Sequence, residues 1–256
     1  MSGIEPVLSV RELAKSFGGV RAVQGVSFDV AAGEMLALIG PNGAGKSTCF
    51  NMLGGQLAPD SGAVTLLGRS IAGAKPREIW RRGVGRTFQI TATFASMSVR
   101  ENVQMALISQ AGGAWNPLAP ARARHVAAAE ALLAQVGMLE QAGRACGILA
   151  YGDLKRVELA IALANGPRLL LMDEPTAGMA PQERIALMAL VARIAKAEAI
   201  AVLFTEHDMD VVFAHADRVL VLDRGRLIAD GPPHAVRNDA GVRAVYLGTD
   251  DGAEGA

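Results

Sequence analysis

The hydrophobic pattern of the first ninety residues predicts strands joined by turns. Apolar and polar positions alternate in two segments, as in half-buried strands, whereas Met35–Ile39 is a continuous apolar run typical of a strand buried on both faces. The segment Lys46–Leu53 is instead helical in character and is followed by Gly54 and Gly55. The strands predicted in this part of the chain are Val7–Val10, Val23–Val30, Met35–Ile39, Gly62–Leu67 and Gly83–Phe88.

The pattern then becomes helical and rich in alanine and leucine, with a glycine-containing loop at 112–117. Apolar, strand-like runs return after residue 165, and the last two flank a turn at 223–226 as a hairpin would. The helices predicted are Val99–Ser109, Ala121–Val136, Leu154–Leu163 and Pro181–Ala197. The later strands predicted are Leu169–Met172, Ala201–Thr205, Val219–Leu222 and Leu227–Ala229.

This order of elements predicts an α/β fold that carries a helical insertion. We expect one domain, 1–256, whose α/β core is formed by 1–90 and 165–248 and whose helical subdomain is 91–164. The acidic, glycine-rich tail 249–256 is expected to be disordered.

Composition narrows the classes of function. The 25 basic residues balance the 25 acidic ones, so a nucleic-acid partner is disfavoured, since such proteins usually carry a basic excess. No apolar run approaches the roughly 18–20 residues that span a bilayer, and the N-terminal residues lack the pattern of a signal peptide. The two cysteines, Cys49 and Cys146, lack a metal-binding spacing and fit a reducing compartment. We expect a cytoplasmic protein that meets the membrane only through a partner.

A glycine-rich loop joins the strand Met35–Ile39 to the helix that starts at Lys46. Gly43 and Gly45 let backbone N–H groups turn toward a phosphate, and the helix N-terminus adds partial positive charge. Lys46 suits the β- and γ-phosphates, and the Ser47 hydroxyl suits Mg²⁺. A chance glycine-rich turn is a weak alternative, because nine positions match in a strand–loop–helix context. The predicted ATP-binding loop is Gly40-Pro41-Asn42-Gly43-Ala44-Gly45-Lys46-Ser47-Thr48.

Two carboxylates follow the apolar strand Leu169–Met172. Asp173 stands where a strand tip would face Mg²⁺, and Glu174 is placed to polarise the attacking water as general base. The competing interpretation is that both acids merely end a strand before a turn. Together with the phosphate loop, the pair predicts an ATPase.

Two further polar residues end predicted strands. His207 follows Ala201–Thr205, where an imidazole would reach the γ-phosphate; a surface or helix-start histidine is the equally weighted alternative. Gln89 follows the strand that precedes the helical insertion, and its amide would contact Mg²⁺ and water. Taken alone, Gln89 is only a polar loop residue.

The ordered set of these motifs resembles the ATPase subunits of ABC transporters, from Leu8 to Gly248. The resemblance implies a P-loop NTPase (RecA-like) core with an antiparallel β subdomain and an inserted α-helical subdomain. It also implies that Phe17 stacks on adenine and that 177–180 crosses to a partner subunit. The family's signature, which caps the nucleotide bound by the opposite subunit, falls on Leu149-Ala150-Tyr151-Gly152-Asp153. Two ATP, with Mg²⁺ held by Ser47, Gln89 and Asp173, would lie in a head-to-tail dimer.

Other segments narrow the resemblance to the ATP-binding subunits of branched-chain amino acid importers, with urea and amide importers as the nearest alternatives. The segments that carry it are 15–23, 85–89, the Tyr151-Gly152 signature and 245–248. Such a subunit pairs with a second ABC ATPase, docks on membrane permease subunits and acts indirectly with a solute-binding protein. It is peripheral on the inner face of the cell membrane. We expect 91–98 to line the permease-docking groove.

The signature departs from the family pattern at two positions. The usual serine is Ala150, so one hydroxyl to the γ-phosphate is missing, and the usual glutamine is Asp153. We interpret Asp153 as the N-cap of the helix Leu154–Leu163. A small-molecule kinase or GTPase, and a non-transport ABC ATPase, are the alternative functions. The signature argues against the first, and the lack of a second cassette or long coiled coil argues against the second.

Overall fold

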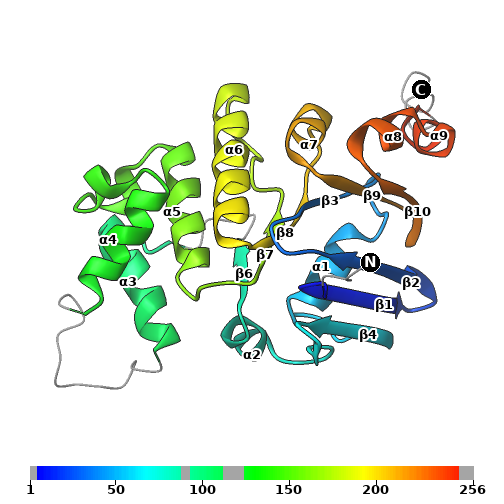
Figure 1. Cartoon of the computed structure of the whole chain (residues 1–256), viewed down its shortest axis with the longest axis horizontal. Helices are drawn as coiled ribbons and strands as arrows, with labels where there is room; N and C mark the ends of the chain where they lie inside the picture. The colour runs from blue at the N-terminus through cyan, green and yellow to red at the C-terminus, as the bar shows by residue number, and fades with distance from the viewer. Residues whose placement is uncertain (1–4, 88–92, 112–123, 248–256) are drawn as a thin grey trace.

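The computed structural model describes residues 5–87, 93–111 and 124–247, which form two sheets and surrounding helices (Figure 1). The smaller sheet is antiparallel, in the strand order β2-β1-β4-β5. Its strands are β1 (Leu8–Phe17), β2 (Val20–Val30), β4 (Ser61–Leu66) and β5 (Arg69–Ser70). The first two are longer than the sequence pattern predicts, because bulges in their pairing interrupt the alternation of apolar and polar positions.

The larger sheet has the strand order β10-β9-β3-β8-β7-β6. Neighbours from β9 to β6 run parallel, and β10 pairs with β9 as the predicted antiparallel hairpin. The strands are β3 (Met35–Ile39), β6 (Val84–Thr87), β7 (Leu169–Asp173), β8 (Ala201–Thr205), β9 (Arg218–Asp223) and β10 (Arg226–Gly231). Strand β3 lies in the interior of the sheet, which explains its uninterrupted apolar sequence.

Alternate residues of β3 face two different hydrophobic clusters. Met35, Ala37 and Ile39 belong to a cluster that includes residues of the later helices, whereas Leu36 and Leu38 pack with the antiparallel sheet. The helices on the first face include α5 (Tyr151–Leu163), α6 (Pro181–Glu198) and α7 (Met209–His215). Helix α1 (Lys46–Leu53) packs on the second face, between the two sheets. Both faces of the parallel sheet are therefore covered.

Helices α3 (Val99–Gln110), α4 (Val126–Gln135) and α5 lie together at one end of the molecule (Figure 1). Their chain leaves the large sheet after β6 and returns at β7, the hydrogen-bonded neighbour of β6. Helix α3 starts with a capping box between Ser98 and Glu101. Two short 3-10 helices, η2 (Leu139–Gln141) and η3 (Cys146–Ile148), connect α4 to α5.

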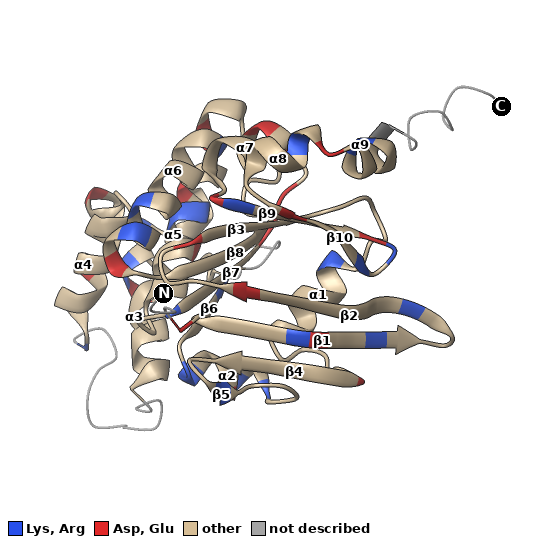
Figure 2. Ribbon diagram, turned by 45° about the vertical axis from the view of Figure 1, so that its right-hand side comes forward, with Lys and Arg blue, Asp and Glu red and all other residues tan. Residues whose placement is uncertain are grey.

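The helices α1, α3, α4, α5 and α6 confirm the predicted ones, with shifted bounds for all but α1. Four short helices were not predicted: α2 (Pro76–Arg81), α7, α8 (Pro233–Asn238) and α9 (Ala240–Leu247). Basic and acidic positions are interspersed over the strands and helices drawn in colour in Figure 2. Among these described elements, no single one collects charges of one sign, which agrees with the balanced charge of the sequence.

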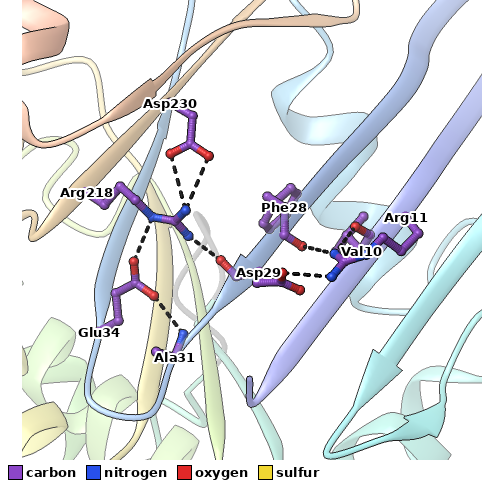
Figure 3. Close-up of polar contacts among 8 residues, drawn as sticks. All are labelled: Val10, Arg11, Phe28, Asp29, Ala31, Glu34, Arg218 and Asp230. Atoms are coloured by element: carbon purple, nitrogen blue, oxygen red, sulfur yellow. Dashed lines mark hydrogen bonds and ion pairs between the residues drawn. The ribbon is translucent and has the colours of Figure 1, made fainter. Parts of the chain in front are cut away.

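A network around Arg218 joins the two sheets (Figure 3). The guanidinium of Arg218, at the start of β9, donates to Glu34 Oε1 at 2.8 Å, to Asp230 Oδ2 at 3.2 Å and to the carbonyl of Asp29. Asp29 belongs to β2 and in turn binds Arg11 of β1 at 2.8 Å. The antiparallel sheet is therefore fixed to the parallel one at the point where the chain passes from β2 to β3.

Candidate functional site

The phosphate loop, Asp173, Glu174 and His207 converge at the carboxyl ends of three parallel strands, whereas Phe17 and the signature lie on other elements. The phosphate loop follows β3, Asp173 ends β7 and His207 follows β8. Because Asp173 is in register with Thr205 of β8, the residues that follow β7 and β8 emerge side by side. This edge of a parallel sheet is where ligands of open α/β folds bind.

Three glycines shape the phosphate loop in ways that other residues would not tolerate. Gly40 has φ of +151°, and a Cβ there would lie 2.1 Å from the carbonyl oxygen of Leu222. Gly45 has φ of +105°, and its Cβ would lie 2.3 Å from the Ala22 carbonyl oxygen. Gly43 has φ of +79° with open space around it. The neighbouring backbone therefore holds both ends of the loop, and its middle opens to a ligand.

Helix α1 begins at Lys46 with Gly45 as its N-cap, and no side chain caps it. The first N–H groups of this helix therefore have no side-chain acceptor and are oriented to bind an anion. Lys46 is only 8% exposed, and its Nζ donates to the carbonyls of Gly40 at 2.6 Å and Pro41 at 3.1 Å. Burial lowers the pKa of Lys46, and the nearby Glu174 and Asp173 oppose this shift. The loop residues thus fit the phosphate groups of a nucleotide.

Asp173 is held by Thr205 and Arg86, which the sequence analysis did not single out. Its Oδ1 accepts a hydrogen bond from Thr205 Oγ1 at 2.8 Å, and its Oδ2 lies 3.9 Å from Nη2 of Arg86. Burial lowers the pKa of Arg86, and Asp173 opposes that shift. Arg86 also binds Asn51 of α1 at 3.0 Å, so the candidate magnesium ligand is tied to the helix of the phosphate loop.

Glu174 and His207 form a pair, with 2.8 Å between Glu174 Oε1 and His207 Nε2. Glu174 has φ of +49°, a strained conformation for a non-glycine residue, and its N–H donates to the Thr205 carbonyl at 3.2 Å. His207 does not start helix α7, because Asp208 is the N-cap there. The histidine lies beside the candidate general base with its side chain 54% exposed, so its role at the γ-phosphate stays a prediction beside the surface interpretation.

The sequence analysis also did not predict the contact between Glu206 and Thr176. Glu206 Oε1 accepts hydrogen bonds from the N–H of Thr176 at 2.9 Å and from its Oγ1 at 2.7 Å. Both side chains are buried, and burial raises the pKa of Glu206. The only sequence signal is that a charged residue follows directly after the apolar strand β8.

The signature residues form the start of α5, and here one interpretation is wrong. Helix α5 begins at Tyr151 with Ala150 as its N-cap, so Asp153 lies inside the first turn and does not cap the helix. An acid in the first turn still favours the helix dipole. Tyr151 is 40% exposed and lies next to Gly178, whose Cβ, if present, would be 3.5 Å from the tyrosine ring.

Phe17 ends β1 with half of its surface exposed, and Lys15 Nζ lies 5.8 Å from its ring centre. Gln89 falls outside the described residues, as do Thr91 and Ala92 of the expected groove segment 91–98. Within that segment Phe94 is 57% exposed. A groove of about 340 Å³ lies between the core and the helical insertion, lined among others by Trp80, Arg86 and Ile161.

Across residues 5–87, 93–111 and 124–247, every helix is too short or too polar to cross a membrane. The same part of the chain holds no group of three His, Cys, Asp or Glu side chains arranged for a metal ion. Asp173 and the Ser47 hydroxyl still fit Mg²⁺, because this ion is usually bound by one or two protein ligands together with substrate phosphates.

Comparison with known proteins supports, over most of the chain, the family resemblance found in the sequence. A family model described as ABC transporter matches residues 23–177, and one described as branched-chain amino acid ATP-binding cassette transporter matches residues 226–252. The chain is 39% identical to the high-affinity branched-chain amino acid transport ATP-binding protein LivG of Salmonella typhimurium, covering 95% of this chain and 98% of that protein. It is 38% identical to the corresponding protein BraF of Pseudomonas aeruginosa, with the same coverage.

Solved structures agree with the fold. The ADP conformation of an ATP-binding cassette from an ABC transporter superposes with a TM-score of 0.85 at 31% identity, covering 95% of this chain and 99% of that one. A nucleotide-free cassette from an ABC transporter gives a TM-score of 0.83 at 31% identity, over 94% and 99% of the two chains.

Proposed function

This chain belongs to the family of ABC transporter ATP-binding subunits, and on that premise we propose that it hydrolyses ATP to power the import of branched-chain amino acids. The observation that carries the proposal is the convergence of Lys46, Asp173 and the Glu174–His207 pair at one sheet edge. The substrate rests on the family model for residues 226–252 and on the relatives that transport these amino acids.

Binding of ATP would begin at the phosphate loop. The N–H groups at the start of α1 bind the phosphates, and Lys46 exchanges its two carbonyl acceptors for phosphate oxygens. Phe17 stacks on the adenine at the exposed end of β1. Ser47, Asp173 and Gln89 would hold Mg²⁺, which supplies positive charge against the charge that develops on the phosphates.

Hydrolysis requires a base that faces the attacking water. Glu174 takes this role, since its carboxylate lies close enough to Lys46 to influence the lysine's pKa. In the tautomer that carries hydrogen on Nε2, His207 donates to the ionised Glu174 carboxylate and orients it toward the γ-phosphate. The strained backbone of Glu174 agrees with a functional position.

The chain forms only half of each nucleotide site. The segment 149–153, in which Ala150 and Tyr151 are exposed, would contact the nucleotide of a second ABC ATPase subunit, as the family resemblance implies. The membrane permease would dock where Phe94 and the groove of Trp80 and Ile161 face outward. A solute-binding protein would act through the permease, on the other side of the membrane from this peripheral subunit.

The substitution Glu174→Gln tests the catalytic assignment. We expect hydrolysis to fall by at least about 100-fold, while ATP is retained and the closed dimer accumulates, because the amide cannot accept the proton from water. Steady-state phosphate release and size-exclusion chromatography with ATP measure both effects. Glu140→Gln, at an exposed position of η2, is the matched control. Normal turnover by Glu174→Gln would refute the assignment.

The substrate is tested in the transporter reconstituted with its permease and binding protein. Uptake driven by ATP is expected for leucine, isoleucine and valine and not for urea or short amides. Uptake of urea alone would assign the chain to the alternative importer class, and turnover without any permease stimulation would favour a non-transport ATPase.

A further inference from the structure

Three consecutive residues, Thr205 at the end of β8 and then Glu206 and His207, bind the end of β7 and the segment that follows it. The bonds of Thr205 and His207 hold the two candidate site carboxylates, as described above. Glu206, between them, points into the protein and receives both hydrogen bonds of Thr176. Glu206 is 5% exposed and Thr176 is 1% exposed, so this bond is shielded from water.

A buried carboxylate is unfavourable unless it is well hydrogen-bonded. Burial is the largest influence on Glu206 and raises its pKa, whereas the side-chain and backbone bonds from Thr176 lower it. A residue needed only to fill this space would be apolar, as Ala201–Phe204 of β8 are. The carboxylate therefore indicates a requirement for a strong acceptor opposite Thr176.

Thr176 belongs to a tight turn that links the catalytic pair to the signature. The N–H of Ala177 donates to the Glu174 carbonyl at 3.2 Å, and the N–H of Met179 donates to the Thr176 carbonyl at 3.1 Å. Gly178, between them, has φ of +78° and lies against the ring of Tyr151. A shift of Thr176 would consequently move Glu174 at one end of the turn and the contact with Tyr151 at the other.

We propose that Glu206 is a positioning residue that fixes the turn 174–179 through Thr176. It keeps Glu174 aligned with His207 for hydrolysis and holds Gly178 against Tyr151 of the signature, which serves the partner subunit's nucleotide. This inference rests on the proposed function. Glu206 acts without touching nucleotide, since the groups that bond to its carboxylate are the N–H and hydroxyl of Thr176 and the N–H of His207.

The test compares four substitutions in the full-length chain, assembled with the permease. Glu206→Leu removes the acceptor and Thr176→Val removes the hydroxyl, whereas Glu206→Gln and Thr176→Ser keep the bonding atoms. We expect kcat to fall roughly tenfold or more in the first two, because small misplacements of catalytic groups are costly, with KM for ATP within about twofold of the wild type. The conservative variants should retain at least about half of kcat.

The double variant Glu206→Leu/Thr176→Val should lose no more than the worse single variant, because the two residues form one interaction. Thermal melting and binding of a fluorescent ATP analogue measure folding and affinity separately. If Glu206→Leu does not fold, Thr176→Val, which has a similar shape and keeps the backbone bond to Glu206, carries the test with the same expected loss of roughly tenfold or more.

The proposal is overturned if kcat of Thr176→Val matches the wild type, or if Glu206→Gln loses as much as Glu206→Leu. It is equally overturned if kcat falls only in proportion to the folded fraction. Glu174→Gln distinguishes failure of the catalytic assignment from failure of this inference. Normal turnover by Glu174→Gln refutes the assignment of Glu174 as general base, whereas an inactive Glu174→Gln enzyme beside a normal Thr176→Val enzyme refutes only the role of Glu206.

Discussion

Ala150 occupies a position whose backbone is ready for a capping side chain that the residue lacks. Its φ of −63° and ψ of 153° are those of a helix N-cap, yet no side chain caps α5. In a closed dimer the same position would face the partner's nucleotide. One missing hydroxyl therefore affects both the stability of α5 and the proposed contact with the γ-phosphate.

The substitution Ala150→Ser should restore both. A serine N-cap is typically worth about 1 kcal/mol over alanine, so we expect Tm to rise by about 2–4 °C. ATP turnover of the dimer should also increase, since the hydroxyl adds a hydrogen bond to the phosphate. Ala131→Ser, within α4 and exposed, is the control and should slightly lower Tm. An unchanged rate with a raised Tm would mean that the clamp does not need this hydroxyl.

At the scale of elements, the two cysteines are buried in helical parts of the structure. Cys49 lies in α1, directly behind the phosphate loop, and burial raises its pKa to about 12. Cys146 starts η3, just before the signature, and burial raises its pKa as well. Because thiolates are the reactive form, both cysteines report on the opening of the elements that carry the site.

We expect neither thiol to react with a chromogenic disulfide reagent at pH 7.5 in the native protein, and two thiols per chain to react in denaturant. Bound ATP should slow the labelling of Cys49 further, because it stabilises the start of α1. The variant Cys146→Ser isolates the Cys49 signal. Rapid labelling of native Cys146→Ser would show that α1 opens readily and that its burial is not maintained in solution.

The elements that the sequence predicted well are those whose own residues determine their ends. Helix Lys46–Leu53 has the predicted bounds because glycines lie at both ends, and β8 is a clean apolar run. The shorter helices α2, α8 and α9 were not predicted, because six to eight residues are too few to show a helical period of apolar positions. Asp153 was misassigned because capping depends on where the helix starts, one residue after Ala150.

The site residues, too, were predicted where their own local sequence determines their position. Lys46, Asp173 and Glu174 were predicted from local motifs that follow buried strands. The bonds of Arg86, Thr205 and Glu206 depend on which strands are neighbours and on their register, which no local pattern encodes. Sequence reasoning therefore gave the candidate nucleotide-binding groups and missed the residues that hold them in place.

At the scale of the whole molecule, the segment expected to dock on the permease and the signature are physically connected. The side chain of Asn102 in α3 binds both the N–H and the carbonyl of Phe94, at 2.8 and 3.2 Å. The N–H of Gly147 donates to the Ala95 carbonyl at 2.9 Å, just before the signature begins. Movement of the helical insertion would therefore carry the expected docking surface and the signature together.

The substitution Phe94→Asp should weaken the permease complex, because a charge would replace an exposed apolar contact. We expect permease-stimulated ATP hydrolysis and co-purification to fall by about tenfold, with Tm of the isolated chain unchanged, since the ring is largely exposed. Ile228→Asp, on the exposed face of β10, is the control. Full coupling in Phe94→Asp would exclude this segment from the docking surface.

The place of β3 between β8 and β9 has a consequence for biosynthesis. Its partners in the sheet lie far along the chain, since Met35 pairs with Val202 and Ile39 with Val221. At about 5–20 residues per second, a ribosome needs roughly 10–40 s to deliver them after β3 emerges. During this interval β3 and the phosphate loop that follows it lack the neighbouring strands β8 and β9. The nascent chain therefore exposes apolar surface that chaperones bind, and nucleotide cannot assist its folding until the residues up to Val221 have been made.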